Sequence, residues 1–197
     1  DVVSVRRRFI SGLGMDPDKK NLVVGHNGSR FNNHLYILNA LKKSALIDLK
    51  EYNVLIPVAY FPDGPEYKRE ILAAIDGIPN VCLIEKLLFG DEFAALRLST
   101  DFFLHLPQSD AMSATLIESI YAGAVPIVGS WLPYGNFDRF GLPLVRVDDF
   151  SEIPEKILDP QYKCSRQIRD NINRFLRSEN VLDQWIEIYN SRVDEGR

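Results

Sequence analysis

The chain has 197 residues, of which 46% are hydrophobic and 25% are charged, so it is long and apolar enough to form one well-packed domain. Its formal net charge of −4 argues against non-specific nucleic-acid binding, which needs a basic surface. Its apolar stretches fall far short of the roughly 18 residues that a membrane span needs. Cys82 and Cys164 belong to no metal or redox motif, which indicates reduced thiols in a cytoplasmic protein. Because the chain begins at Asp1 and not at a methionine, we expect a piece of a longer protein.

Short apolar segments alternate with longer amphipathic segments over the first 150 residues. Six short segments predict strands, at residues 22–24, 54–58, 81–84, 102–104, 125–128 and 144–147. Several are apolar at successive positions, which is typical of strands covered on both faces. Helical patterns lie between them: one carries Leu35, Leu38, Leu41 and Leu46 on one face, and others cover 67–75, 92–98 and 114–122. Gly123 is a suitable stop for the last of these helices.

This alternation predicts an α/β fold: a Rossmann-like, doubly wound parallel sheet of about six strands with helices on both faces. We expect a single domain, with a linker or edge strand over residues 1–20, an α/β core over 21–150 and C-terminal helices over 151–197. The C-terminal segment repeats apolar residues at helical spacing, namely Ile168, Ile172, Phe175, Leu176, Leu182, Trp185, Ile186 and Tyr189.

Such a fold predicts where a ligand binds. In doubly wound sheets the site lies beyond the carboxyl ends of the strands, where the strand order reverses. If 22–24 is the first core strand and 102–104 the fourth, the loops that follow them should meet at that point. These loops, 25–30 and 105–110, are also the two most polar and unusual segments of the chain.

The second of these loops leads into a helix that should begin near Ser113. A helix start presents unpaired N–H groups and a positive dipole end, which suits a diphosphate, and the hydroxyls of Ser113 and Thr115 could add donors. A carboxylate at Glu118 can chelate a pair of ribose hydroxyls, and Asp110 can reach sugar hydroxyls. Alternatively, Ser109 or Asp110 merely caps the helix and Glu118 is solvated.

Residues 109–128 resemble a segment of retaining glycosyltransferases with the GT-B fold. Asp110, seven intervening residues and Glu118 are similar to the E-x7-E motif of that family, with aspartate in the first position, and Gly123 and Pro126 fall in register. The resemblance makes the two acids the catalytic candidates, with Glu118 on the ribose hydroxyls and Asp110 on the transferred sugar. The residues that it implies for binding the donor in this segment are Ser109, Met112, Ser113, Ala114 and Thr115.

The loop after the first strand carries Gly25 and Gly28, which permit a tight turn and close backbone approach. Ser29 or Asn32 could cap the following helix, and Arg30 could pair with a phosphate. A plain helix-capping loop would explain the same residues.

The same loop resembles that of the transferase family that moves 4-acetamido-4,6-dideoxygalactose onto the lipid-linked enterobacterial common antigen. The similarity of pattern spans most of residues 21–130. The donor-binding residues that it implies in this loop are Gly25, Asn27, Gly28, Arg30, Asn33 and His34.

Several other segments carry weaker signals. In GT-B enzymes the loop after the third strand borders the nucleobase. Lys86 in this loop could also reach a phosphate, although a solvated Glu–Lys pair is the simpler account. His26, His34 and His105 have no metal-ligand spacing, and each is interpreted first as a hydrogen-bonding loop residue. The aromatic segment 131–134 could stack on a sugar or pack against another domain. The arginine run 6–8 is either solvated or faces a membrane surface or another domain.

The resemblance therefore implies the donor-binding, C-terminal half of a glycosyltransferase that transfers a sugar from a nucleoside diphosphate to a glycan or lipid-linked acceptor in polysaccharide biosynthesis. We expect no metal and no cofactor, no nucleic-acid partner, and an acceptor domain N-terminal to this chain, without which the fragment is inactive. The expected location is the cytoplasm, with contact at the inner face of the membrane left open. The alternatives are a GT-B-like nucleotide-sugar epimerase, an inverting transferase or a non-catalytic Rossmann-like interaction domain.

Overall fold

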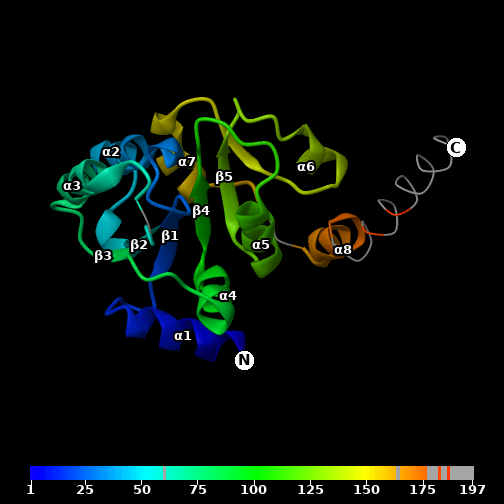
Figure 1. Ribbon diagram of the computed structural model, residues 1–197, viewed down its shortest axis with the longest axis horizontal. Helices are drawn as coiled ribbons and strands as arrows, with labels where there is room; N and C mark the ends of the chain where they lie inside the picture. Colours follow the sequence, from blue (N-terminus) through cyan, green and yellow to red (C-terminus); the bar gives the residue numbers. More distant parts are fainter. Residues whose placement is uncertain (60, 163–164, 177–181, 183–185, 187–197) are drawn as a thin grey trace, which may run out of the picture.

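A six-stranded parallel sheet forms the centre of the computed structural model, which describes residues 1–59, 61–162, 165–176, 182 and 186 (Figure 1). The strand order is β3-β2-β1-β4-β5-β6, and every neighbouring pair is parallel. The strands are β1 (Lys20–Val24), β2 (Tyr52–Pro57), β3 (Val81–Ile84), β4 (Phe102–His105), β5 (Val125–Gly129) and β6 (Val145–Val147). The prediction of a doubly wound α/β fold with six parallel strands is confirmed.

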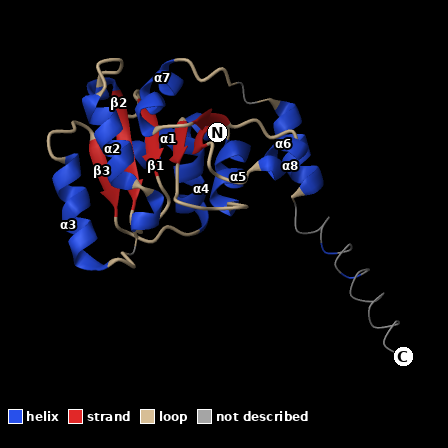
Figure 2. Cartoon of the chain, turned by 90° about the horizontal axis from the view of Figure 1, so that it is seen from above, coloured by secondary structure: helices blue, strands red, loops and turns tan. Residues whose placement is uncertain are grey.

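Helices surround the sheet (Figure 2). They are α1 (Val2–Gly12), α2 (His34–Lys43), α3 (Gly64–Ile75), α4 (Gly90–Ser99), α5 (Ala114–Ala122), α6 (Gly135–Arg139), α7 (Ile153–Leu158) and α8 (Arg166–Phe175), with 3-10 turns at Arg30–Asn32, Leu49–Glu51 and Phe150–Glu152. None of the helices in the described part of the chain is long and apolar enough to span a lipid bilayer.

The sheet is covered on both faces because each strand sends its side chains alternately into two apolar clusters. Within β1, Leu22 and Val24 pack in the cluster that contains the apolar residues of α2, α3 and α7. Val23 packs in the opposite cluster, with α1, α4, α5 and α8. All three side chains are fully buried, which explains why this strand is apolar at consecutive positions.

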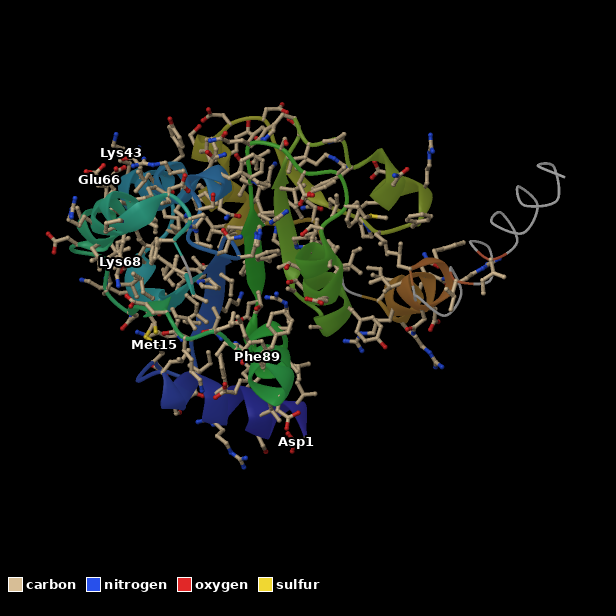
Figure 3. All side chains as sticks on the ribbon, in the orientation of Figure 1. Asp1, Met15, Lys43, Glu66, Lys68 and Phe89 are labelled. Carbon is tan, nitrogen blue, oxygen red and sulfur yellow. The ribbon has the colours of Figure 1, made fainter. Side chains whose placement is uncertain are left out.

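The first residues form helix α1, where the sequence predicted a linker or an edge strand. The side chain of Asp1 caps the helix by accepting a hydrogen bond from the Ser4 amide at 2.9 Å, and Figure 3 labels Asp1 at this end of the helix. Arg6 makes two hydrogen bonds, at 2.9 and 2.6 Å, to the carboxylate of Asp101 just before β4. Ile10 is fully buried against the sheet. Long-range packing and the ion pair therefore decide a structure that the local alternation of valines did not reveal.

Two other boundaries differ from the prediction. Helix α2 ends at Lys43, so Leu46 lies beyond it and is exposed. Helix α6, which follows the aromatic segment 131–134, was not predicted. The C-terminal region is helical as expected through α7 and α8, and Leu182 and Ile186 are helical and exposed. Cys164, Trp185 and Tyr189 lie outside the described residues.

Candidate functional site

The two predicted loops meet at the point where the strand order reverses, between β1 and β4. The Gly25 amide donates to the Leu104 carbonyl at 3.1 Å, and the Gln108 amide donates to the Phe31 carbonyl at 2.9 Å. The side-chain amide of Asn33 donates to the Leu106 carbonyl at 2.8 Å. These bonds fix the first loop against the second, so the expected juxtaposition is confirmed.

The first loop turns sharply at Gly25, which has a left-handed φ of 66°. A Cβ atom at this position would lie 2.7 Å from Nε2 of His34, so the close approach requires glycine. The side-chain oxygen of Asn27 accepts hydrogen bonds from the Ser29 amide at 2.9 Å and from Nδ2 of Asn32 at 2.8 Å. Ser29 caps the 3-10 turn Arg30–Asn32, and Asn33 takes the position before α2, so neither Ser29 nor Asn32 caps that helix.

Arg30 and His34 are both held by protein groups. Arg30 pairs with both carboxylate oxygens of Glu70 on α3, and this hydrogen bonding raises the pKa of Arg30. Arg30 also lies over the Tyr67 ring, 4.5 Å from its centroid, and lines a hollow with Asn33. His34 is fully buried, with Nδ1 at 3.1 Å from the Tyr67 hydroxyl, and burial lowers its pKa to about 4. His34 is therefore neutral, and it packs against the first loop as a buried residue.

The second loop leads into α5, which begins at Ala114 as predicted. Ser113 is the capping residue, because its Oγ accepts a hydrogen bond from the Leu116 amide at 3.2 Å. The alternative that Ser109 or Asp110 caps the helix is therefore wrong. No described residue accepts a hydrogen bond from the Ala114 or Thr115 amide, so the first turn keeps free donors.

Helix α5 also ends as predicted. Gly123 takes a left-handed φ of 108° and closes the helix through hydrogen bonds from its amide to the carbonyls of Ser119 and Ile120.

Asp110 lies in a triangle of hydrogen-bonding groups. Its Oδ2 is 3.0 Å from Nε2 of His105 and 3.0 Å from the hydroxyl of Tyr134, and these two partners are 2.9 Å apart. Its Oδ1 accepts a bond from the Met112 amide at 3.3 Å. Hydrogen bonding by His105, and then by Tyr134, lowers the pKa of Asp110 to about 2, so the carboxylate is ionised at neutral pH.

Glu118 is half-exposed and pairs with a buried cation. Its Oε2 lies 3.3 Å from Nε of Arg97 on α4, whose side chain is only 8% exposed. The Arg97 guanidinium lies over the Phe93 ring, 4.3 Å from its centroid, and burial lowers the pKa of Arg97. Glu118 is thus anchored on one side, while its exposed side stays free for a ligand.

Lys86 lies apart from these groups, after the edge strand β3. It is exposed and pairs with Glu92 at 2.6 Å, while the neighbouring Glu85 pairs with Lys68 of α3, which Figure 3 labels. Both residues are exposed and ion-paired, but with these other partners and not with each other as the simpler account had it, and a phosphate contact by Lys86 stays a prediction. The assigned roles of the other candidates are likewise predictions, of which Ser109 and Met112 are exposed at the second loop.

Three residues of the site were not identified from the sequence as its partners. His105 is the last residue of β4 and fully buried, not a loop residue. Tyr134 is only 1% exposed, although its segment was interpreted as a surface for a sugar or another domain. Arg97 carried a single signal, a charged residue inside the apolar run of α4. Trp131 does lie at the surface, where its Nε1 donates to the Pro107 carbonyl at 2.9 Å. Within the described ranges, no group of three or more His, Cys, Asp or Glu side chains is arranged to hold a metal ion.

The fold matches solved structures of glycosyltransferases. The C-terminal domain of LpcC, a glycosyl transferase group 1 family protein from Francisella tularensis, matches with a TM-score of 0.66 at 14% identity, over 88% of this chain and 93% of that one. HepE from Anabaena, solved in complex with UDP and glucose, matches with a TM-score of 0.75 at 14% identity, over 95% and 52%. Sucrose-phosphate synthase from Thermosynechococcus elongatus matches with a TM-score of 0.67 at 15% identity, over 98% and 51%.

These likenesses show the fold: the chain has the architecture of a GT-B C-terminal domain. It spans about half the length of HepE and of sucrose-phosphate synthase. No protein-family model and no curated protein sequence matches it.

Proposed function

We propose that this chain is the donor-binding domain of a glycosyltransferase, which binds a nucleoside-diphosphate sugar between the two loops. The observation that carries the proposal is the start of α5 at the switch point of the sheet. There, free amides are flanked by two carboxylates, Asp110 and Glu118, each anchored by buried partners. A site of this composition suits a ligand that combines a diphosphate with hydroxyl groups on both sides.

Each part of the donor has a matching group. The amides of Ala114 and Thr115, at the positive end of the α5 dipole, would bind the diphosphate. Glu118 would accept hydrogen bonds from the ribose hydroxyls, and Asp110 from those of the transferred sugar. As the sugar leaves, negative charge grows on the diphosphate, and the helix start would stabilise that charge without a metal ion.

The remaining parts of the proposal concern the whole enzyme. The acceptor, a glycan or a lipid-linked sugar, would bind a domain N-terminal to this chain, and transfer would occur in the cleft between the two. This chain alone would then bind the donor without turning it over. The cytoplasm, with access to the inner face of a membrane, stays the expected location, and the role in polysaccharide biosynthesis stays a prediction.

Titration calorimetry with UDP, dTDP and GDP and with their glucose conjugates tests donor binding. We expect one base to be preferred, and Glu118→Ala to weaken binding of that diphosphate by about 10- to 100-fold, the loss of charged hydrogen bonds to two hydroxyls. Glu118→Gln keeps the side-chain length and separates the effect of charge from that of shape.

The matched control is Glu66→Ala, since Glu66 is an exposed acid near the start of α3. This variant should bind as the unmodified chain does. Unchanged affinity in Glu118→Ala would reject the ribose role. A chain that binds none of the six compounds would overturn the proposed function in favour of a non-catalytic domain.

A further inference from the structure

We propose that His105 and Tyr134 are positioning residues that occupy Oδ2 of Asp110 and leave Oδ1 as the acceptor for hydroxyls of the donor sugar. The inference rests on the proposed function for its ligand. It goes further in two ways. It assigns the carboxylate oxygen of Asp110 that accepts hydrogen bonds from the sugar, and it names the residues that orient this carboxylate.

The two partners come from different elements and are rigidly held. His105 ends β4, is fully buried and stacks on Phe103 with ring centroids 5.2 Å apart. Tyr134 precedes α6, is 1% exposed and packs against Phe137 with centroids 4.8 Å apart. The Asp110 side chain is 25% exposed, so it alone of the three reaches from the interior to the surface.

The proton positions follow from counting donors. An ionised carboxylate only accepts hydrogen bonds, and a tyrosine hydroxyl supplies one proton. Because Nε2 of His105 lies 3.0 Å from the carboxylate oxygen, a lone pair on Nε2 would be repelled, and we assign the proton to this nitrogen. Nδ1 of His105 is then a bare acceptor. That assignment agrees with its burial without a partner among the described residues, since a buried unpaired N–H is the costlier case.

Two donors therefore converge on Oδ2. From the residues that the structure describes, Oδ1 accepts a hydrogen bond only from the Met112 amide, at the longer distance of 3.3 Å, so it retains capacity for a hydroxyl donor. With a pKa of about 2, Asp110 is already ionised at neutral pH and has no proton to donate. Asp110 thus serves the sugar as an acceptor and not as a general acid.

Two further titratable groups come from other elements: His26, whose ring lies close to that of His105, and Arg97, which acts on His26. His26, in the first loop, lies behind His105 with ring centroids 5.6 Å apart, and burial lowers its pKa to about 4. Arg97, from α4, opposes protonation of His26. His26 is therefore neutral near pH 7, and the low pKa of Asp110 comes chiefly from the hydrogen bonds of His105 and Tyr134, which outweigh the effect of burial.

The experiment compares Tyr134→Phe, His105→Gln and His105→Leu in this chain, with Tyr36→Phe as the control at an exposed tyrosine. The first readout is the pKa of Asp110, followed through its carboxyl carbon by nuclear magnetic resonance. Tyr134→Phe and His105→Leu should raise that pKa from about 2 toward its ordinary value of 3.8, whereas His105→Gln, which keeps an N–H donor, should raise it less.

The second readout is calorimetry with UDP-glucose and dTDP-glucose against UDP and dTDP, which lack the sugar. Tyr134→Phe should weaken the sugar conjugate about 5- to 10-fold relative to the diphosphate alone, because only the conjugate meets Asp110. Tyr36→Phe should change neither readout.

The outcomes test two claims separately: that His105 and Tyr134 position Asp110, and that Asp110 contacts the sugar. An unmoved pKa of Asp110 in both Tyr134→Phe and His105→Leu would overturn the positioning role. A moved pKa with equal losses for UDP and UDP-glucose would overturn the sugar contact. If the unmodified chain binds none of these four compounds and neither GDP nor GDP-glucose, the proposed function fails together with the sugar contact, and the resonance measurement still decides whether the two residues position Asp110.

Discussion

Replacing Ile10 with alanine should lower the free energy of unfolding by about 2–5 kcal/mol, because it removes a fully buried side chain from the centre of an apolar cluster. Ile10 joins helix α1 to the sheet, where it packs in one cluster with Val23 and Leu96. Strand and helix neighbours of this kind collapse only partly into the space left behind, so a cavity adds to the lost burial. Urea denaturation followed by circular dichroism measures the change.

Val3→Ala is the matched control, since Val3 lies on the same helix and is 65% exposed. This variant should change stability by no more than about 0.5 kcal/mol. Equal, small effects of the two substitutions would mean that α1 is not packed on the sheet, and the first residues would then be the linker that the sequence suggested.

Gly25→Ala should cost about 2–5 kcal/mol of stability, from two separate causes. A left-handed backbone costs a non-glycine residue about 1–2 kcal/mol, and overpacking adds about 1–3 kcal/mol. The crowding arises because the new Cβ would meet Nε2 of His34 at 2.7 Å and Cβ of Asn32 at 3.1 Å. His34 cannot easily move aside, since it is fully buried and bonded to Tyr67.

Gly14→Ala measures the cost of the left-handed backbone without the crowding. Gly14 has a similar φ of 71°, but nothing lies within 4 Å of the place that a Cβ atom would take there. Its substitution should cost about 1–2 kcal/mol in the same urea experiment. If both glycines cost the same, the contact with His34 contributes nothing and the loop tolerates a side chain.

The sheet and α5 were predictable because their signals are local. Consecutive apolar residues such as those at 22–24 identify strands covered on both faces, and Ser113 and Gly123 bracket one short amphipathic helix. Helix α1 was not predictable in this way. Its decisive contact joins Arg6 to Asp101, and the burial of Ile10 depends on elements distant in sequence.

The candidate site was predictable in position but not in its supporting contacts. The reversal of strand order and the spacing of Asp110 and Glu118 drew attention to the correct end of the sheet. Nothing in the sequence pairs Asp110 with Tyr134, 24 residues away, or Glu118 with Arg97, 21 residues away.

Spacing also does not tell whether a cation is free for a ligand. Arg30 was a candidate phosphate partner, yet in the structure it pairs with Glu70, 40 residues further along the chain.

The place of β4 in the sheet has a consequence for how the chain folds. Asn21 and Asp101, which are hydrogen-bonded at the start of β1 and β4, are 80 residues apart. Closing so long a loop costs chain entropy, and this cost is offset only when the strands have paired. Docking of β4 is therefore expected to be slow and late. Since the Gly25 amide bonds to the Leu104 carbonyl, the turn that shapes the first loop waits for the same step. The ability to bind a ligand would therefore arise only when β4 has docked.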